Sequence, residues 1–563
     1  MRNKEKQDPM IEINGHQLHL YNLIDVARNY KKVRLSEKAR QNMMRSYLWV
    51  KESSQTIFDQ NDNLDGQEQP RKQHSKNIPI YGVNTGFGSL ARIRIPPQDS
   101  SKLSINLIRS HAAGVGPIAP KDVTRATMVL RANALAKGVS GCRPDLVDLL
   151  LEMLNRDLTP KIPLQGSCGS SGDLAPLAHL GLVMIGDEKG EAWVGKELLS
   201  APEALKKVGL QPLQLEAKDG LAITNGAQLS TAITALSLYD AQNIVLSAEI
   251  FMAMSMEALL GISRAFDPKV HQMRPYKGAQ DCAHNIRALI EGSNLVDSVP
   301  EKLQDAYSIR CTPQVIGAAR DNLDFISKQV AIELNAATDN PLILLPEEEE
   351  TKEQNDVYTG NYAYSAGMFH GEPMGMAADL LKIAVAEIGS LSERRLYRLT
   401  TGNLSQLLPP GLEGRDRPVV GMMVPQTTAA ALVSENKALG WPATMDSIPT
   451  CEDQEDHIAM STVAARRAQQ VVQNTQKVIA IEALCAAHAL EYRREGGEHI
   501  QFGIGAKSVL PLIEAILYDI KEDATIGEQI EAIADNIQQG LFVEELCKKI
   551  SSIRKIFPSG DTE

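Results

Sequence analysis

The stretch GSCGSSGDLAPLAHL, residues 166–180, sets a loop of Gly and Ser directly before Asp173 and a run of Leu and Ala. Such a loop can cap a helix, with Ser170 or Ser171 as the N-cap and Asp173 stabilising the first turn through the helix dipole. The loop does not match the GxxxxGK[ST] or GxGxxG patterns of nucleotide-binding loops. It also fails the GxSxG pattern of serine hydrolases, because Asp173 stands where the second Gly belongs.

The same loop can make an electrophile from its own backbone. In Ser170-Ser171-Gly172, the amide nitrogen of Gly172 could attack the carbonyl carbon of Ser170, because glycine has no Cβ to prevent the close approach. Loss of water from the new ring, and of the Ser171 hydroxyl as a second water, would leave a conjugated ring with an exocyclic methylene. Proteins otherwise borrow cofactors for such chemistry. The residues alone leave the helix cap and the electrophile as alternatives.

Long helices are predicted to position this loop. They span residues 226–264, 314–337, 373–400 and 457–493. In the last of these stretches, residues at i, i+1, i+4, i+7 and i+8 fall on one helical face: Val471, Val472, Thr475, Val478 and Ile479. Hydrophobic residues make up 43% of the chain but aromatics only 4%, which favours a core of aliphatic helices. Such helices are typical of a bundle and are often completed by other subunits.

Charge and cysteine usage exclude several classes of protein. The net charge of -12 argues against nucleic-acid binding, which normally needs a basic face. The seven cysteines are scattered without a CxxC pair, so neither a disulfide framework nor a zinc site is indicated, and a reducing cytoplasm fits best. The most apolar stretch, residues 241–263, carries Glu249 and Glu257, which indicates a buried helix and no membrane span.

We expect four segments along the chain. Residues 1–77 form a start region and a polar linker, 78–225 a smaller N-terminal domain that bears the Gly/Ser loop, 226–496 a central long-helix bundle, and 497–563 a few short amphipathic helices. The sequence IPIYG at 78–82 has the character of a β-strand. The acidic stretch at 346–356 reads as a solvated loop.

The Gly/Ser loop resembles the prosthetic-group loop of the histidine and aromatic amino-acid ammonia-lyases. In that family an Ala-Ser-Gly triplet forms methylidene-imidazolone (MIO). Ser170 replaces the usual Ala, and because cyclisation uses its carbonyl the ring is still expected. The resemblance extends from Ile78 to Arg494, with several motifs in the same order. It implies a mainly α fold, a long-helix bundle of the ammonia-lyase type with a smaller N-terminal MIO-loop region, and MIO formed from Ser170-Ser171-Gly172 without metal or nucleotide.

Two further motifs resemble parts of the family's catalytic site. YGVNTGFG at 81–88 resembles the loop with the catalytic tyrosine, here Tyr81. A tyrosine hydroxyl can take a proton from the β-carbon of an amino acid if its anion is stabilised locally. TNGAQ at 224–228 places Asn225 at the start of a long helix, where it could be an N-cap. The resemblance implies that Asn225 also lies near the substrate amino group and the MIO ring.

QDAYSIRCTPQ at 304–314 offers Gln304, Tyr307 and Arg310. Tyr307 and Arg310 are neighbours if this stretch is helical, and arginine binds carboxylates through a planar two-point bond. The alternative for a lone arginine is a surface ion pair. The resemblance implies that Arg310 holds the substrate carboxylate, that Tyr307 helps the proton transfers, and that Gln304 contacts the substrate.

SAGMFHGEP at 365–373 contains Phe369, whose counterpart in the family packs beside the MIO ring. The family usually has Asn before this Phe, where the present chain has Met368. The resemblance therefore implies altered hydrogen bonds around the ring.

Two polar positions indicate the substrate side chain. In IRSHAAGVG at 108–116, Ser110-His111 is the pattern of the histidine-specific members. In DQEDHIAM at 453–460, Glu455 stands where the aromatic lyases typically have Gln. A carboxylate suits an imidazole N–H and is costly against a phenyl ring. The alternatives are a satisfied, partly buried histidine and a capped helix start.

The resemblance implies elimination of ammonia from L-histidine to give trans-urocanate. His111 and Glu455 would hold the imidazole, and Tyr81 would be the base, with Glu455 as a possible partner in that role. The MIO would capture the substrate through its amino group, with attack by the imidazole ring as an alternative. The implied enzyme is a homotetramer with shared active sites, so Tyr81 and Glu455 of one chain need not be close. Alternatives are a phenylalanine or tyrosine ammonia-lyase, a 2,3-aminomutase, and a non-catalytic helical scaffold.

Overall fold

The computed structural model describes residues 10–55, 79–88, 91–346, 361–413, 421–497, 499–519 and 525–557. The chain is mainly helical, as expected, and divides into two compact units. The first comprises residues 1–236, 329–376 and 442–466, and the second comprises 237–328, 377–441 and 467–563. The segment boundaries expected at residues 77, 225 and 496 stay a prediction. The acidic stretch after Pro346, and the linker from residue 56 to 77, lie outside the described residues.

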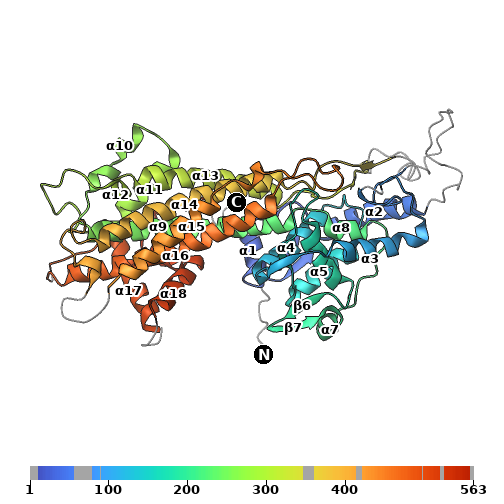
Figure 1. The fold of residues 1–563 in the computed structure, drawn as a ribbon, viewed down its shortest axis with the longest axis horizontal. Helices are drawn as coiled ribbons and strands as arrows, with labels where there is room; N and C mark the ends of the chain where they lie inside the picture. Colours follow the sequence, from blue (N-terminus) through green and yellow to red (C-terminus); the bar gives the residue numbers. More distant parts are fainter. Residues whose placement is uncertain are drawn as a thin grey trace, which may run out of the picture. The chain divides into compact units, whose positions relative to one another are not determined.

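The first unit consists of short helices and small sheets (Figure 1). Its helices are α1 (Leu20–Ala27), α2 (Glu37–Ser54), α3 (Ser100–His111), α4 (Lys121–Ala136), α5 (Pro144–Asn155), α6 (Leu174–Met184), α7 (Ala201–Lys207) and α8 (Asp219–Thr224). Its strands are β1 (Ile11–Ile13), β2 (Val33–Leu35), β3 (Val115–Ile118), β4 (Leu158–Pro160), β5 (Pro163–Gln165), β6 (Glu191–Val194), β7 (Glu197–Ser200), β8 (Leu342–Ile343) and β9 (Ala363–Tyr364).

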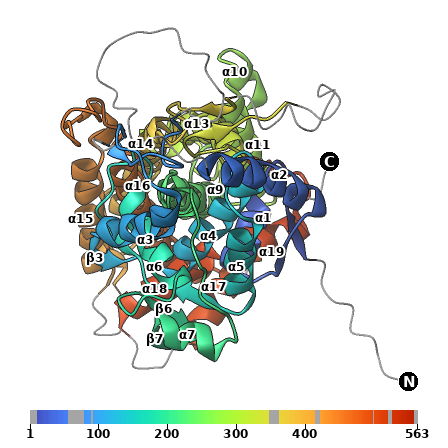
Figure 2. The same cartoon turned by 90° about the vertical axis from the view of Figure 1, so that its right-hand side faces the viewer.

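The sheets of the first unit are local ribbons at the edge of its helical core. β1 pairs with β2 in parallel, while the pairs β3–β5 and β8–β9 and the three-stranded sheet β4–β6–β7 are antiparallel. Helix α7 lies against the β6–β7 hairpin (Figure 2). The core itself is helical: α6 packs against both α3 and α8. This packing brings the Gly/Ser loop before α6 close to the end of α8.

The strand predicted at 78–82 is wrong for its described part. Tyr81 begins a turn, and Val83 and Asn84 both donate backbone hydrogen bonds to the carbonyl of Ile80. The Asn84 side chain also accepts from the backbone N–H of Ile80 at 2.7 Å. These local bonds satisfy the polar backbone groups that a strand would have offered to a neighbour.

The second unit contains most of each long helix. The predicted long helices are confirmed as α9 (Gln228–Ala258), α13 (Thr312–Glu333), α14 (Glu372–Thr400) and α16 (Ser461–Arg494). Each of these four helices contributes residues to both units. Helix α9 ends earlier than expected because Leu260 adopts a left-handed φ of 49°, which lets Gly261 donate to the Met256 carbonyl and close the helix.

The long helices of the second unit pack closely. Together with α15 (Met423–Leu439), they run side by side in Figure 1. A Cβ on Gly389 of α14 would lie 3.1 Å from the Thr475 hydroxyl of α16, which is a tight contact, so the two helices lie close together at this glycine. The predicted apolar face of α16 is confirmed, since Val471, Val478 and Ile479 are all buried.

The remaining elements of the second unit are shorter. They are α10 (Pro268–Gln272), α11 (Lys277–Leu289), α12 (Tyr307–Arg310), α17 (Ile504–Asp519), α18 (Ile526–Gln538) and α19 (Leu541–Lys549). The last three lie after residue 497, where a few short amphipathic helices were expected. In the described part of the chain, no helix is both long enough and apolar enough to cross a membrane.

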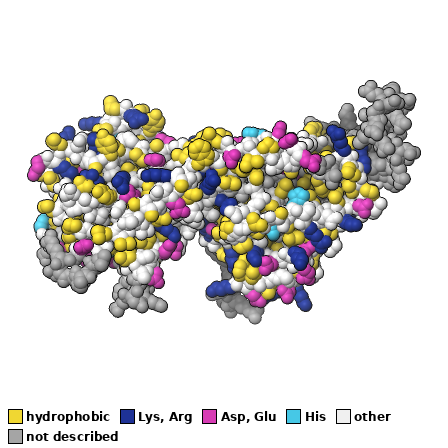
Figure 3. All heavy atoms as spheres, in the orientation of Figure 1, with side chains coloured by type: hydrophobic (Ala, Val, Ile, Leu, Met, Phe, Trp, Pro, Cys, Tyr) yellow, Lys and Arg dark blue, Asp and Glu magenta, His cyan; other side chains and the backbone are white. Residues whose placement is uncertain are grey.

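The surface of the second unit exposes several large apolar side chains. The face seen in Figure 3 shows many of this kind over the long helices. The exposed ones include Leu303, Tyr307, Phe325, Leu407, Met423 and Val424. Large exposed apolar areas commonly mark surfaces that contact other proteins.

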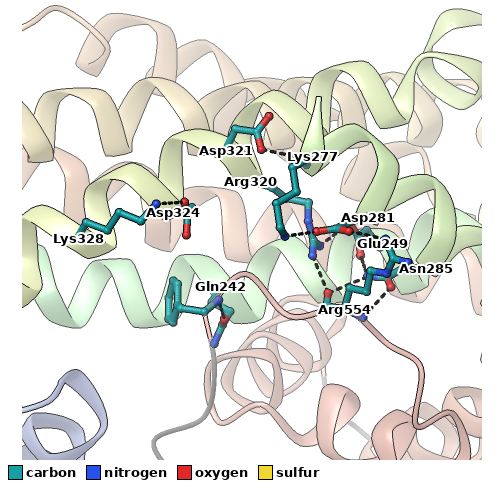
Figure 4. A network of polar contacts seen from close by, with 12 residues as sticks. Gln242, Glu249, Lys277, Asp281, Asn285, Arg320, Asp321, Asp324, Lys328 and Arg554 are labelled. Atoms are coloured by element: carbon teal, nitrogen blue, oxygen red, sulfur yellow. Dashed lines mark hydrogen bonds and ion pairs between the residues drawn. The ribbon is translucent and has the colours of Figure 1, made fainter. Parts of the chain in front are cut away.

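Buried charged side chains bind the segment after α19 to helices of this unit (Figure 4). Glu249 of α9 accepts hydrogen bonds from Arg320 of α13 at 2.8 Å and from Asn285 of α11 at 2.7 Å. The backbone carbonyl of Arg554 accepts from Arg320 at 2.6 Å, and its side chain binds Asp281 at 2.7 Å. The segment after α19 therefore joins three helices through one polar network.

Candidate active site

A cavity of about 630 Å³ lies within the first unit. Seven of the predicted site residues line it: Tyr81, His111, Ser170, Ser171, Asn225, Phe369 and Glu455. Tyr81 and Glu455 of one chain did not need to be close under shared active sites, and they line the same cavity. Ser110 and Gly172 adjoin lining residues. The cavity therefore combines the Gly/Ser loop with both of the residues predicted to bind the substrate ring.

Gly172 occupies a position that only glycine fits. Its φ is 74°, in the left-handed region, and an added Cβ would lie 2.4 Å from the backbone nitrogen of Gly226. The side-chain amide of Asn225 donates to the Ser171 carbonyl at 2.8 Å. The backbone of the triplet is thus held against the segment that follows α8.

Asp173 anchors the start of α6, so the helix-cap interpretation of Ser170 and Ser171 is wrong. Asp173 occupies the N-cap position, and its side chain makes no capping bond to its own helix. Its fully buried carboxylate instead accepts from the Ser167 hydroxyl at 2.8 Å, from the Ser230 backbone N–H at 2.9 Å, and from the Thr462 hydroxyl. Sequence reasoning missed this role because Ser230 and Thr462 lie 57 and 289 residues away.

Asn225 is also not an N-cap. It follows the last residue of α8, while α9 begins three residues later at Gln228. Its amide nitrogen binds the Ser171 carbonyl, and its Oδ1 is buried without a hydrogen-bond partner among the described residues. A buried amide oxygen without a partner is costly unless a ligand or water satisfies it.

Glu455 lies in residues 442–466 of the first unit, and its side chain contacts the Gly/Ser loop. The Ser171 hydroxyl donates to its Oε1 and the Thr450 hydroxyl to its Oε2. The backbones of Thr450 and Glu455 also pair, with N···O distances of 3.0 and 3.4 Å. Nearby, the backbone N–H of Ala459 donates to the Ser170 hydroxyl at 3.3 Å, a bond that the family's usual Ala would lack. Thr450 was not identified from the sequence.

His111 ends α3 with its ring in a defined orientation. Its Nδ1 lies 2.8 Å from the carbonyl of Leu107, and since a carbonyl can only accept, Nδ1 must carry the proton. In the neutral ring Nε2 is therefore left as an acceptor. Burial lowers the pKa of His111, which favours this neutral form. Ser110 lies beside it, with its hydroxyl 3.0 Å from Nδ1, and does not line the cavity.

Tyr81 lines the cavity with its hydroxyl held by the adjoining loop. The backbone N–H of Gly88 donates to the hydroxyl oxygen at 3.1 Å. The ring meets that of Phe87 edge to face, at a centroid distance of 6.2 Å. This bond and the ring contact fix the position of the Tyr81 hydroxyl at the cavity.

Asn340, His370 and His457 also line the cavity and were not predicted as site residues. Asn340 donates to the Ser365 hydroxyl at 3.1 Å and accepts from the Ala366 backbone at 2.8 Å, which positions the segment that carries Phe369. The rings of His370 and His457 stack 6.2 Å apart. No sequence pattern would have found them, because their roles depend on contacts between distant segments.

Met368, the departure before Phe369, is 48% exposed and does not line the cavity. Nothing in the structure explains the substitution.

Gln304, Tyr307 and Arg310 belong to the second unit and are not among the lining residues. Tyr307 and Arg310 are neighbours on α12, as predicted, with the guanidinium 4.8 Å from the centre of the tyrosine ring. Arg310 forms no salt bridge within the described residues, so the surface ion-pair interpretation is not supported there. Tyr307 is 69% exposed, and Gln304 is exposed as well.

Comparison with known proteins agrees with this arrangement. The family model described as aromatic amino acid lyase matches residues 67–514. A histidine ammonia-lyase from Caldanaerobacter subterraneus subsp. tengcongensis is 41% identical over 96% of this chain and 98% of its own. The crystal structure of histidine ammonia-lyase from Trypanosoma cruzi is 32% identical, covers 99% of each chain, and superposes with a TM-score of 0.83. Tyrosine aminomutase from Streptomyces globisporus is 31% identical, covers 96% of this chain and 99% of its own, and gives a TM-score of 0.82. The chain belongs to the aromatic amino acid lyase family.

Proposed function

We propose that the chain is a carbon–nitrogen lyase that eliminates ammonia from L-histidine to give trans-urocanate. The observation that carries this proposal is the presence of His111 and Glu455 in one cavity with Ser170-Ser171-Gly172. Two polar groups suit an imidazole ring, whereas facing a phenyl ring they would lose their hydrogen bonds with water. The high identity to a protein named histidine ammonia-lyase supports the same substrate.

The prosthetic group of the proposed enzyme is MIO, made from Ser170-Ser171-Gly172. The residues present fit this group: Gly172 is held where only glycine fits, and Asn225 donates to the Ser171 carbonyl, which would become the ring carbonyl. The buried Oδ1 of Asn225 has no partner among the described residues and is free for a ligand donor such as an amino group. When formed, MIO supplies an electrophile that makes the substrate amino group a better leaving group.

The side chains of the cavity then bind and orient the substrate. His111 Nε2 and the Glu455 carboxylate are both acceptors, so either can receive the single N–H of a neutral imidazole, and together they suit the two N–H groups of a protonated one. Tyr81 is the proposed base for the β-carbon proton, and the Gly88 N–H holds its hydroxyl oxygen in place. Glu455 lines the same cavity and can share that role.

We propose that the working enzyme is a homotetramer with shared active sites. Arg310 is the residue proposed to hold the substrate carboxylate, Tyr307 to help the proton transfers, and Gln304 to contact the substrate. None of the three lines the cavity, so another copy of the chain would supply them. Arg310 Nε, which is buried without a hydrogen-bond partner among the described residues, and exposed apolar side chains such as Leu303 support assembly through this region.

Two measurements on the purified chain test the proposal. Product formation is followed in parallel from L-histidine, L-phenylalanine and L-tyrosine by near-ultraviolet absorbance, with chromatography for β-amino acids. Urocanate from histidine alone is expected; cinnamate, coumarate or a β-amino acid would replace the substrate or reaction assigned here. Intact mass is expected to be two waters below the calculated mass, and a chain at full mass would exclude MIO.

A further inference from the structure

The turn that carries Glu455 has an uncommon backbone. Three consecutive residues, Cys451, Glu452 and Asp453, have φ values of 51°, 55° and 64°. Left-handed conformation costs about 1–2 kcal/mol for each residue that is not glycine. The two backbone hydrogen bonds between Thr450 and Glu455 close this turn. Strain of this kind persists where the surrounding structure enforces it, and it is frequent at functional sites.

The two oxygens of Glu455 have different donors. Oε1 accepts from the Ser171 hydroxyl and Oε2 from the Thr450 hydroxyl. Formation of MIO removes the Ser171 hydroxyl as water, so Oε1 then loses its donor. Oε2 keeps its donor, because Thr450 takes no part in ring formation. The mature chain keeps the Thr450 donor at Oε2 and lacks the Ser171 donor at Oε1, and the Cys451 thiol also contacts this carboxylate.

We propose that Thr450 is a positioning residue for substrate specificity: its hydroxyl holds Oε2 of Glu455 so that Oε1 accepts the imidazole N–H in the place vacated by the Ser171 hydroxyl. This proposal rests on the function proposed above. In this proposal the turn has two roles. Its backbone pairing sets the position of Glu455, and the Thr450 hydroxyl sets the direction of the Glu455 carboxylate. A side-chain hydrogen bond to a charged group contributes about 1.5–3 kcal/mol.

The test compares Thr450→Val, which keeps the shape but lacks the hydroxyl, with Thr450→Ser, which restores it. Thr428→Val is the matched control, because the exposed Thr428 bonds through its hydroxyl to the Val424 carbonyl of its own helix. For each full-length variant we would measure inhibition by trans-urocanate, kcat and KM for L-histidine, the thermal midpoint and the intact mass.

Thr450→Val is expected to weaken urocanate binding and raise KM for histidine about tenfold or more, which corresponds to the loss of such a hydrogen bond. Thr450→Ser should return both values to within a few-fold of wild type. The thermal midpoint and the loss of two waters should be unchanged, because the backbone pairing and ring formation do not need this hydroxyl.

Urocanate inhibition in Thr450→Val equal to that of the Thr428→Val control would overturn the proposal. So would failure of Thr450→Ser to restore binding, because the effect would then not come from the hydroxyl. These outcomes would leave the proposed function standing if the wild-type chain still forms urocanate. A wild-type chain that forms no urocanate would remove both.

Discussion

Two glutamates, one in each unit, differ in the donors that hold them. Glu455 of the first unit accepts from the neutral hydroxyls of Ser171 and Thr450 and faces a cavity. Glu482 of the second unit is fully buried in α16 and is bound by Arg395, with an Nη2–Oε2 distance of 2.7 Å, and by the Ser255 hydroxyl at 2.8 Å. Both carboxylates are satisfied, but only Glu482 has a cationic partner among the described residues.

The difference shows what each carboxylate can do. A buried carboxylate paired with arginine has its charge compensated, and removing either partner leaves the other uncompensated. Glu249 with Arg320 in Figure 4 is a second pair of this kind. A carboxylate held by hydroxyls keeps its charge available for a ligand. Pairing with arginine therefore suits structural stability, whereas a carboxylate held by hydroxyls suits substrate binding.

The largest effect is expected at the cavity, from Ser171→Ala. The variant should form no urocanate, because MIO needs the Ser171 hydroxyl as a leaving group, and its mass should equal the calculated mass. Its thermal midpoint should stay near that of wild type, since the change removes one hydroxyl beside a cavity. Near-wild-type turnover would refute the MIO assignment.

The same substitution at the two glutamates should have opposite consequences. Glu482→Gln should cost about 3–5 kcal/mol of unfolding free energy, because Arg395 is left as an uncompensated buried charge. Glu455→Gln should cost less than about 1 kcal/mol of stability, but should lower kcat/KM for histidine about tenfold or more. Denaturant titration with kinetics of the folded fraction measures both. Equal losses of stability at the two positions would break the comparison.

A third carboxylate, Glu257, also lies in the second unit. Its comparison with Glu482 tests what the bound arginine contributes. Burial raises its pKa from 4.5 to about 7, and its Oε1 has no partner among the described residues. Because the pKa is higher in the folded chain, the stability that this group contributes is full below pH 4.5 and is lost as the pH rises through about 7.

Glu257→Gln should remove this pH dependence. The stability of the variant relative to wild type should therefore rise by up to about 3 kcal/mol between pH 4.5 and pH 8. Urea midpoints across this range would measure it, with Glu482→Gln as the control that keeps Glu257. A constant difference between variant and wild type would show that Glu257 is compensated in the folded chain.

The smallest effect is expected from His111→Leu, which should shift preference from histidine toward phenylalanine. Loss of the Nε2 acceptor should change the ratio of the two kcat/KM values about 10- to 100-fold. Ser110→Ala, which changes a neighbour that does not line the cavity, should shift the ratio much less. An unchanged preference in His111→Leu would place the ring pocket elsewhere.

Regular helices were predictable because their pattern is local. The long helices α9, α13, α14 and α16 follow from apolar residues that recur within a few positions. The end of α9 depends on a single residue, Leu260, whose φ is left-handed. The Ser-Ser-Gly triplet was likewise readable, because its chemistry depends on three consecutive residues. The turn at Tyr81 was not, since IPIYG has strand-like residues, whereas the turn depends on hydrogen bonds that Val83 and Asn84 make with Ile80.

The sequence by itself indicated the residues that we propose carry the chemistry: a triplet that can become an electrophile, a tyrosine, and two polar residues at the ring position. Only the tertiary structure decided how they meet. Asp173 accepts hydrogen bonds from residues that lie 57 and 289 positions away in the sequence. The Ser171 hydroxyl donates to Glu455, which lies 284 positions away. Periodicity and short motifs report on neighbours along the chain, whereas a hydrogen bond between distant segments depends on the packing of every element between them. Thr450 and Asn340 therefore became visible as site residues only in the folded chain.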